Sequence, residues 1–518
     1  MQMAGVVTLP EKVIQKIKTS ILPQWKACFW SAMVVGLIAH IYKLTNWLPN
    51  WDSLVFRYDA QNMLAIGRWF LPVVSAPSSY YDLPFINGLL AIVFFALGAV
   101  CICRMFKVQK TVTAVLIGAV VVSFPSVTSV LTYNYVADAY AFSFFLSCVA
   151  AWLLTREKPR FLAASLLITL SVGIYQAYVT VTIMLLLCYL IMGLLQQQTT
   201  VKTILQKSGV FLASGVLGMG LYYGVLLVLL KLTGTTLLDY QGASSTATLA
   251  GIDLFGSLYT IKETLVGYFF DFSNGLSVFS VLNVAVFAIA VGLYTVILIK
   301  RKSGVLKALV VCVLVVLLPL GACALSFINS GVDYHNLMTM GFVAFYLLLI
   351  LLYEQTDFDG CNFHAVKQWV ILALVALLVC NHAVIANVSY HKLNMAYEKS
   401  YGTLIRIADR IEQAEGADQC NRILVLGALD GSEAYSAVLP PNITGTTDGF
   451  VLRADDEVVG QSVMCSALND YCGTAYTFVA GEEKTTLMQK IKADTLPCWP
   501  HKESIQVVDE VIVVKLSD

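Results

Sequence analysis

The stretch that decides the fold is residues 84–103, PFINGLLAIVFFALGAVCIC, which contains no charged side chain. The hydrocarbon core of a bilayer is about 30 Å thick, and about 20 helical residues are needed to cross it. This stretch therefore predicts a membrane-spanning helix. Similar stretches recur along the chain and predict eleven spans, near residues 27–46, 84–103, 111–131, 136–154, 161–175, 177–195, 209–230, 277–299, 305–328, 336–353 and 368–388.

The composition of the whole chain agrees with a membrane protein. Among its 518 residues, 58% are hydrophobic and only 13% are charged, whereas soluble domains carry about 25% charged residues. A soluble globule of this composition would expose large apolar patches and aggregate. The same figures exclude a disordered chain, a collagen and a small disulfide scaffold. The predicted fold class is an α-helical polytopic membrane protein.

The charge is distributed unevenly and divides the chain near residue 390. Up to that residue there are 22 Lys and Arg against 14 Asp and Glu, a balance of +8; from residue 391 onward there are 11 against 19, a balance of −8. The second part is also less hydrophobic. We therefore expect a transmembrane domain over 1–390 and a soluble domain over 391–518. No basic patch with interleaved aromatic residues stands out, so nucleic acid is not an expected partner.

The soluble domain shows the patterns of helices and strands. An amphipathic helix is predicted over 397–415, with Leu404, Ile407 and Ile411 on one face. Strands are predicted over 422–427, 474–480 and 505–516. A helix followed by strands is typical of a small α/β or α+β unit.

The positions of Lys and Arg predict the orientation in the membrane. With the N-terminus in the cytoplasm, seventeen of these residues lie in inner loops and five in outer loops, as the positive-inside rule requires. An odd number of spans then places the C-terminal domain outside the cell membrane. The acidic residues of the membrane domain gather on the outer side, so we expect the chemistry to take place there.

Cysteine and histidine give no sign of a metal site. The six histidines are scattered and no C-x-x-C pair occurs, so neither a metal nor another cofactor is expected. Nine of the 13 cysteines sit in or beside predicted spans. The other four permit two disulfides in an oxidising compartment, with four free thiols as the alternative: Cys420, Cys465, Cys472 and Cys498.

The first outer segment, residues 47–83, carries most of the candidate chemistry. It holds the acids Asp52 and Asp59 and the arginines Arg57 and Arg68. An enzyme that acts on a membrane-bound phospho-sugar needs a carboxylate to deprotonate the attacking hydroxyl and a fixed cation to hold the leaving phosphate. Arginine suits the second task because its planar fork matches phosphate oxygens and it stays charged.

We expect these four side chains to converge on one cleft. Residues 54–66 are predicted to form a helix on the membrane surface, and Tyr81 is a candidate sugar contact from the tyrosine cluster that follows. The alternative is structural. In that interpretation Arg57 and Arg68 bind lipid headgroups, Asp52 caps the following helix, and the aromatic residues settle at the headgroup level.

Three further outer positions are candidates. Asp138 lies at the outer start of the fourth span, where an ionisable group indicates function by default or is simply favoured by the helix dipole. Tyr175 and Gln176 break the apolar run between the fifth and sixth spans and predict a tight turn, which either contacts a sugar or places its tyrosine in the aromatic belt of the membrane interface. Asp333 and His335, in the polar turn between the ninth and tenth spans, are candidate acceptor contacts or parts of a solvated loop.

Several short motifs resemble one known family. These are the acid after the first span with Gly67, Arg68 and Trp69, then Asp138 with Tyr140, then Gly173, Tyr175, Gln176 and Tyr178, and finally the ending with Pro497, Cys498, Trp499 and Pro500. Together they resemble the glucosyltransferase II family, membrane enzymes that add glucose to O-antigen. Family patterns often show two adjacent acids where this chain has Trp51 and Asp52. Asp52 and Asp59 therefore both stand as candidates for the catalytic acid position.

The resemblance implies a glycosyltransferase of the GT-C type, with many transmembrane helices and an active site on the outer face. The implied donor is a polyprenyl-phosphate sugar, most often glucose on undecaprenyl phosphate, and the implied acceptor is a cell-surface polysaccharide. Inversion at the anomeric carbon is expected. Two other functions stay open: a polysaccharide polymerase or ligase, and a flippase or transporter for a lipid-linked sugar. A transporter should show internal repeats and polar residues at mid-span, whereas the polar groups here cluster at the outer ends of spans.

Overall fold

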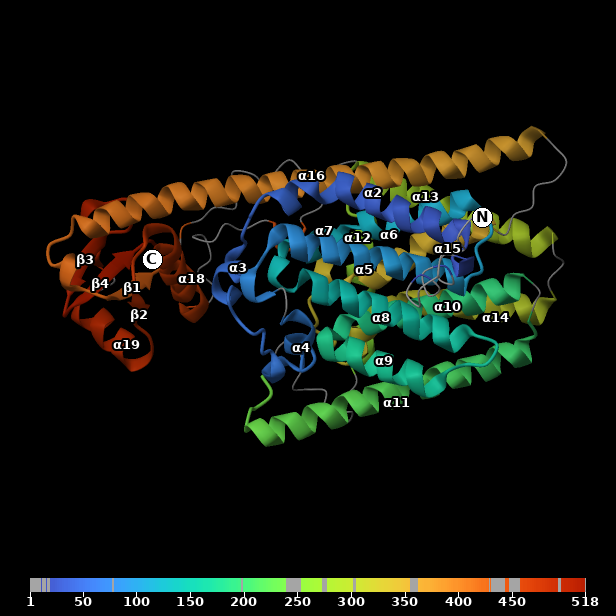
Figure 1. Ribbon diagram of the computed structural model, residues 1–518, viewed down its shortest axis with the longest axis horizontal. Helices are drawn as coiled ribbons and strands as arrows, with labels where there is room; N and C mark the ends of the chain where they lie inside the picture. The colour runs from blue at the N-terminus through green and yellow to red at the C-terminus, as the bar shows by residue number, and fades with distance from the viewer. Residues whose placement is uncertain are drawn as a thin grey trace, which may run out of the picture.

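The helices of the chain lie side by side in one elongated bundle, and a small domain with a β-sheet is attached at one end (Figure 1). The computed structural model describes residues 11, 15, 19–76, 79–196, 199–238, 253–272, 277–300, 304–354, 362–427, 429, 443–446, 457–491 and 495–517. The long helices are α2 (Pro23–Thr45), α5 (Pro84–Met105), α6 (Thr111–Ser123), α7 (Pro125–Thr132), α8 (Ala137–Thr155), α9 (Phe161–Ile174), α10 (Val179–Leu195), α11 (Val201–Thr233), α12 (Leu254–Phe269), α13 (Val278–Lys300), α14 (Val305–Ala322), α15 (Val343–Glu354) and α16 (Asn362–Glu412).

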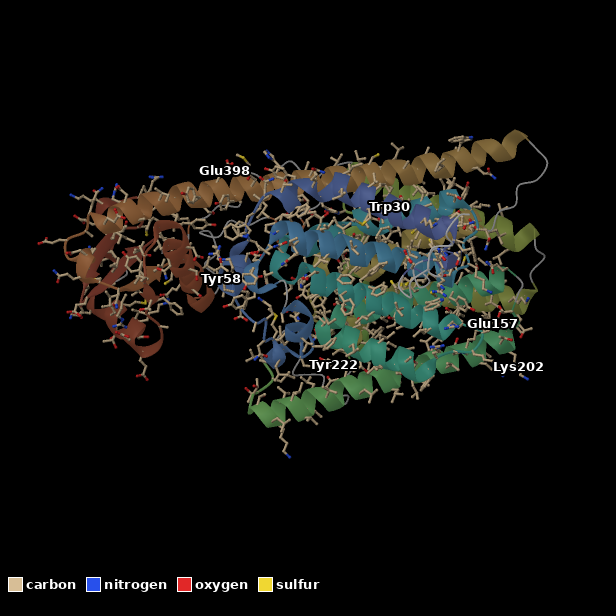
Figure 2. The ribbon with its side chains drawn as sticks, in the orientation of Figure 1. Trp30, Tyr58, Glu157, Lys202, Tyr222 and Glu398 are labelled. Carbon is tan, nitrogen blue, oxygen red and sulfur yellow. The ribbon has the colours of Figure 1, made fainter. Side chains whose placement is uncertain are left out.

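Shorter elements join these helices at the end of the bundle that faces the small domain. They are the helices α3 (Trp51–Phe56) and α4 (Leu71–Ser75) and the 3-10 turns η1 (Leu64–Ile66), η3 (Asn134–Val136), η4 (Gln176–Tyr178) and η8 (Asn336–Met338). Glu157 and Lys202 lie at the opposite end (Figure 2).

Each of the eleven predicted stretches falls on a helix or a bent pair of helices. Within the described residues, eight helices are long and apolar enough to cross a membrane, and the pair α6 and α7, bent by 42°, is either a ninth, broken span or a re-entrant loop. The bend occurs where Pro125 starts α7, because proline lacks the N–H that would continue the helix. The remaining two stretches fall on the shorter helices α9 and α15. The protein is therefore a polytopic membrane protein, and the span count of eleven stays a prediction.

Small residues allow the helices to approach closely. A Cβ added at Gly118 of α6 would collide with the backbone oxygen of Cys28 in α2. At Gly36 it would lie 2.9 Å from Ile92 of α5. Membrane helices pack mainly through such close van der Waals contacts, since lipid provides little hydrophobic force between them.

The last helix connects the membrane bundle to the small domain without a break. α16 runs for 51 residues, through the predicted domain boundary at residue 390 and on to Glu412. Figure 1 shows it along one side of the bundle and then beside the sheet. The helix predicted over 397–415 is thus the end of α16, and its predicted face is confirmed because Leu404, Ile407 and Ile411 are buried in the core of the small domain.

The small domain is a four-stranded mixed sheet with helices on both faces. Its strands β1 (Arg422–Leu426), β2 (Thr477–Phe478), β3 (Ile505–Val508) and β4 (Val511–Lys515) lie in the order β2-β1-β4-β3. α16 and α18 (Glu457–Cys472) pack on one face, and α19 (Gly481–Lys490) packs on the other. The sheet confirms the predicted α/β character of this region.

One strand prediction was wrong. Residues 505–516 form an antiparallel hairpin of β3 and β4, not a single strand. Asp509 and Glu510 both have positive φ, 51° and 60°, in the turn between the strands, as two-residue hairpin turns require. Cys420, Cys465, Cys472 and Cys498 all belong to the described residues and none of them forms a disulfide, so the two disulfides permitted by the sequence are not formed.

Replacement of Gly118 by alanine should destabilise the bundle, because the new methyl group collides with helix backbone and not with a flexible side chain. We expect the free energy of unfolding to fall by about 1–3 kcal/mol, measured as a lower thermal midpoint in detergent. Gly220→Ala on α11 is the matched control, since a Cβ there meets nothing within 4 Å. Equal midpoints for the two variants would contradict the close α2–α6 contact.

Candidate active site

The first outer segment folds as a short helix followed by turns, and not as the helix predicted over 54–66. α3 begins after Asn50, whose side-chain Oδ1 accepts a hydrogen bond from Ser53 N at 3.0 Å. The helix ends at Phe56, and Tyr58 and Gln61 both have positive φ, 59° and 56°. Left-handed conformations cost non-glycine residues energy and cannot continue a right-handed helix. The predicted surface helix is therefore wrong.

The turn at Gly67 and Arg68 is held by two side chains from distant helices. Tyr222 of α11 donates a hydrogen bond to the carbonyl oxygen of Gly67 at 3.1 Å. Gln176 Nε2, in η4, donates to the carbonyl oxygen of Ile66 at 2.8 Å. Gly67 has φ of 83°, and a Cβ there would lie 2.5 Å from the Tyr222 hydroxyl and 2.8 Å from Gln176 Nε2. Only glycine fits this turn without displacing its two partners.

The next two residues of the turn dock on α9. Phe70 N donates to the carbonyl oxygen of Gly173 at 2.8 Å. A Cβ on Gly173 would lie 2.8 Å from the Trp69 ring. The two glycine motifs singled out in the sequence, at 67–69 and 173–178, are therefore neighbours in space.

The Arg68 side chain is buried against two tyrosines. Its Nη1 donates to the hydroxyl of Tyr140 at 2.8 Å, and its guanidinium lies 4.7 Å from the centroid of the Tyr175 ring. The Tyr140 and Tyr175 rings are themselves stacked at 4.6 Å. A guanidinium held over an aromatic face gains cation–π stabilisation, more so where water is excluded. Arg68 is thus a fixed positive charge in a partly dry site.

Arg68 lies at the edge of a cavity of about 130 Å³. Other side chains with polar groups on its wall are Tyr175, Gln176, Tyr222, Tyr223 and His335. Figure 2 shows Tyr222 between α11 and the bundle. The rest of the wall is apolar and comes from α10, α11 and the loop between α14 and α15, including Met219, Leu226, Ile328 and Val332.

His335 is a neutral group in this cavity. Burial, with Arg68 as a second cause, lowers its pKa to about 4, and Asp333 opposes this shift only in part. The imidazole is therefore uncharged at pH 7. Its Nδ1 is buried and has no hydrogen-bond partner among the described residues.

Two of the predicted acids lie close to this site. Asp52 lies in the first turn of α3, the helix whose Phe56 ring stacks on the Tyr135 ring of η3 at a centroid distance of 5.8 Å. Asp138 is buried, 5% exposed, in the first turn of α8, two residues before Tyr140. The structure thus brings Asp52, Asp138 and Arg68 to the same end of the bundle.

Other predicted residues lie elsewhere. Arg57 forms an ion pair with Asp470 of α18, and its guanidinium lies 4.8 Å from the Trp47 ring centroid. Asp59 is exposed, and its Oδ1 accepts a hydrogen bond from Gln61 N at 2.6 Å. Tyr81 is 59% exposed. Asp333 is also exposed, although it is close enough to influence His335.

The sequence did not single out three residues that shape the site. Tyr140 was noted only as part of a motif, and Tyr222 lies within an apolar span where nothing marks it. Asp82 is buried, and its carboxylate accepts hydrogen bonds from Trp47 Nε1 at 3.0 Å and from Asn134 Nδ2 at 2.6 Å. It ties the first outer segment to η3. The acid's place just before an apolar span was a signal for an outer position but not for this role.

Comparison with known proteins decides the family. The model of the family described as glucosyl transferase GtrII matches residues 41–353, more than half of the chain. The chain belongs to this family. It is a glycosyltransferase, which acts on a sugar donor and an acceptor and is embedded in a membrane. No curated protein and no solved structure matches the chain.

The GtrII match includes α3, the Gly67–Arg68 turn, η4, α11 and the loop that carries His335, and thus every residue named on the cavity wall. The small domain and α16 lie outside the matched residues. The family resemblance inferred from short motifs is therefore confirmed.

Gly67→Ala should strongly reduce glycosyl transfer, because the methyl group would displace Tyr222 and Gln176 and release the turn that carries Arg68. We expect a loss of about 100-fold in kcat/KM, since small misplacements in an active site have effects of this size. Gly234→Ala is the control: Gly234 also has positive φ, 69°, but a Cβ there meets nothing within 4 Å. Similar losses in both variants would show that backbone strain, and not the clamp on the turn, matters.

Proposed function

We propose that the protein transfers glucose from a polyprenyl-phosphate donor to a cell-surface polysaccharide on the outer side of the cytoplasmic membrane. The observation that carries this proposal is the position of Arg68 at the polar edge of a cavity whose remaining wall is apolar. A fixed guanidinium fits a phosphate, and apolar walls between membrane helices fit an isoprenoid chain. A donor that contains both a phosphate and an isoprenoid chain therefore suits this cavity.

The proposed orientation has the N-terminus inside the cell and the small domain outside. The candidate site lies at the end of the bundle next to the small domain, where α3 packs into that domain through Leu54. The loops with Glu157 and Lys202 lie at the other end (Figure 2), and the basic residues around them favour a cytoplasmic position. The polyprenyl donor would then be used after its sugar has been flipped outward.

In the proposed reaction, a hydroxyl oxygen of the acceptor attacks the anomeric carbon of the donor. Asp52 accepts the proton of that hydroxyl as general base. The bond between the anomeric carbon and the phosphate oxygen breaks, and the electron pair leaves with the phosphate. Arg68 stabilises the charge that develops on this oxygen, as fixed cations do for leaving phosphates. A single displacement of this kind inverts the anomeric carbon.

The remaining predicted residues take supporting roles in this proposal. Tyr175 and His335 would shape the sugar site because they line the cavity, and Asp138 would do so from the same turn of α8 as Tyr140, the hydrogen-bond partner of Arg68. Gln176 would hold the Arg68 turn through the bond it donates to Ile66. The outer Tyr81 and Asp333 would contact the acceptor. Arg57 would join the membrane domain to the small domain through Asp470.

The test of this function is transfer by the purified protein from undecaprenyl-phosphate [14C]glucose to candidate cell-surface glycans, scored as label bound to polymer. Asp52→Asn should reduce transfer by about 100-fold to 10,000-fold, the usual contribution of a general base. Asp59→Asn should retain transfer, since Asp59 is exposed and caps a local turn. If Asp59→Asn abolishes transfer and Asp52→Asn does not, Asp59 is the base. Absence of transfer from this donor by the folded wild-type protein would refute the proposed function.

Arg68→Lys should raise the KM for the donor by about tenfold, because lysine keeps the charge but loses the planar fork that binds phosphate and stacks on Tyr175. The KM for the acceptor should change little. Arg57→Lys is the matched control, since Arg57 lies against Trp47 and Asp470. A larger effect on donor KM in the Arg57 variant would transfer the phosphate role to Arg57.

A further inference from the structure

A short piece of the chain from the C-terminal part packs into the outer end of the membrane bundle. Residues 443–446 come between β1 and α18 in the sequence, yet they contact helices of the bundle. Ile443 is 1% exposed and lies in an apolar cluster with Phe279 of α13 and Ile385 of α16.

Thr444 is held to the bundle by hydrogen bonds from all of its polar groups. Its N–H and its hydroxyl donate to Asn336 Oδ1 at 2.9 and 3.0 Å. Asn336 N donates to the Thr444 hydroxyl oxygen at 3.1 Å. Ser129 Oγ of α7 donates to the Thr444 carbonyl oxygen at 2.8 Å. Such a fully paired contact fixes the position of both partners.

Gly445 allows this contact to be close. It has φ of 88°, and a Cβ there would collide with the Thr132 hydroxyl and lie 2.8 Å from the Tyr133 ring. These two residues end α7 and lead into η3, the turn that carries Tyr135. The segment 443–446 therefore contacts the bundle at two places, the turn that begins at Asn336 and the end of α7 just before η3.

The turn that binds Thr444 is itself part of the cavity wall. Asn336 starts η8, and the residues just before and at the end of this turn, His335 and Met338, line the cavity with Arg68. His335 Nδ1 has no hydrogen-bond partner among the residues described. The position of the imidazole therefore depends strongly on the backbone of the turn, which Thr444 holds through Asn336.

We propose that Thr444 and Gly445 are positioning residues of the transfer site, which hold the turn at 335–338 so that His335 meets the hydroxyls of the donor sugar beside Arg68. That the ligand is a donor sugar rests on the proposed function. The coupling of Thr444 to His335 does not depend on that function. A neutral imidazole both donates and accepts hydrogen bonds, as recognition of a sugar requires. The C-terminal part of the chain thereby completes a site whose other named residues belong to the membrane bundle.

The first experiment measures the position of His335 without any substrate. The probe is diethyl pyrocarbonate, which modifies neutral imidazoles, with the modification rate of each histidine followed by mass spectrometry. Thr444→Val keeps the shape of the side chain but loses the two hydroxyl bonds to Asn336. Since a lost buried hydrogen bond shifts such a local equilibrium by about tenfold, the modification rate of His335 should rise by about that factor.

Two further variants make this result specific. Thr446→Val is the matched control, because its hydroxyl is also buried in the segment but donates only to Ile443 O, at 2.7 Å. Thr444→Ser should restore the wild-type rate. An equal change in the Thr444 and Thr446 variants, or no change in either, would overturn the positioning role.

The second experiment is a double-mutant cycle that tests whether Thr444 affects the transfer reaction through His335. Thr444→Val should lower kcat/KM for the undecaprenyl-phosphate glucose donor by about tenfold in the wild-type background. It should have little further effect in a His335→Ala background, because residues that act through one another are not additive. Additive losses would show that Thr444 does not act through His335. If the wild-type protein transfers no glucose, the proposed function fails, and the modification experiment still decides the coupling.

Discussion

The structure of the bundle end next to the small domain depends on how one permanent positive charge, that of Arg68, is stabilised there. Arginine cannot shed its charge, and burying it beside a bilayer is costly unless other groups surround it. Arg68 is 9% exposed and is surrounded by the Tyr140 hydroxyl and the Tyr175 ring. Gln176 and Tyr222 hold the backbone turn that carries Arg68.

Residues from α8, η4 and α11 must therefore meet around this single side chain. A small residue lets α11 approach the neighbouring α9, since a Cβ at Gly218 would lie 2.9 Å from the Ile168 side chain. Because the cost of an uncompensated guanidinium is high, the site is expected to be rigid before substrate binds. Rigid placement of a cation is what stabilisation of a leaving phosphate needs, since no energy is then spent on reorganisation during the reaction.

The parts of the fold that follow from local properties were predictable from the sequence. Length and apolar composition located all eleven apolar helical stretches, although the stretch 111–131 is divided into α6 and α7 at Pro125. The break at Tyr175 and Gln176 marked the turn after α9, because two polar residues interrupt an apolar run. The resemblance of short motifs was sufficient to identify the family.

Features set by contacts between distant residues were not predictable. α3 ends early because Tyr58 and Gln61 adopt left-handed conformations, while Gln61 Nε2 donates back to the Phe56 carbonyl at 2.7 Å. Arg57 does not line the cavity with Arg68 but pairs with Asp470, which is more than 400 residues further along the chain. Tyr222 is likewise 155 residues from Gly67. Spacing along the chain carries no information on such pairs.

The unbroken course of α16 determines how the small domain meets the cell surface. A helix rises about 1.5 Å per residue, so the 13 residues from His391 to Thr403, before Leu404 enters the core of the small domain, correspond to roughly 20 Å of stiff rod. No hinge interrupts it between lipid and sheet. In the proposed orientation the stiff helix thus fixes the distance between the sheet and the bilayer. The sheet can then reach only the glycan strands that pass at this distance.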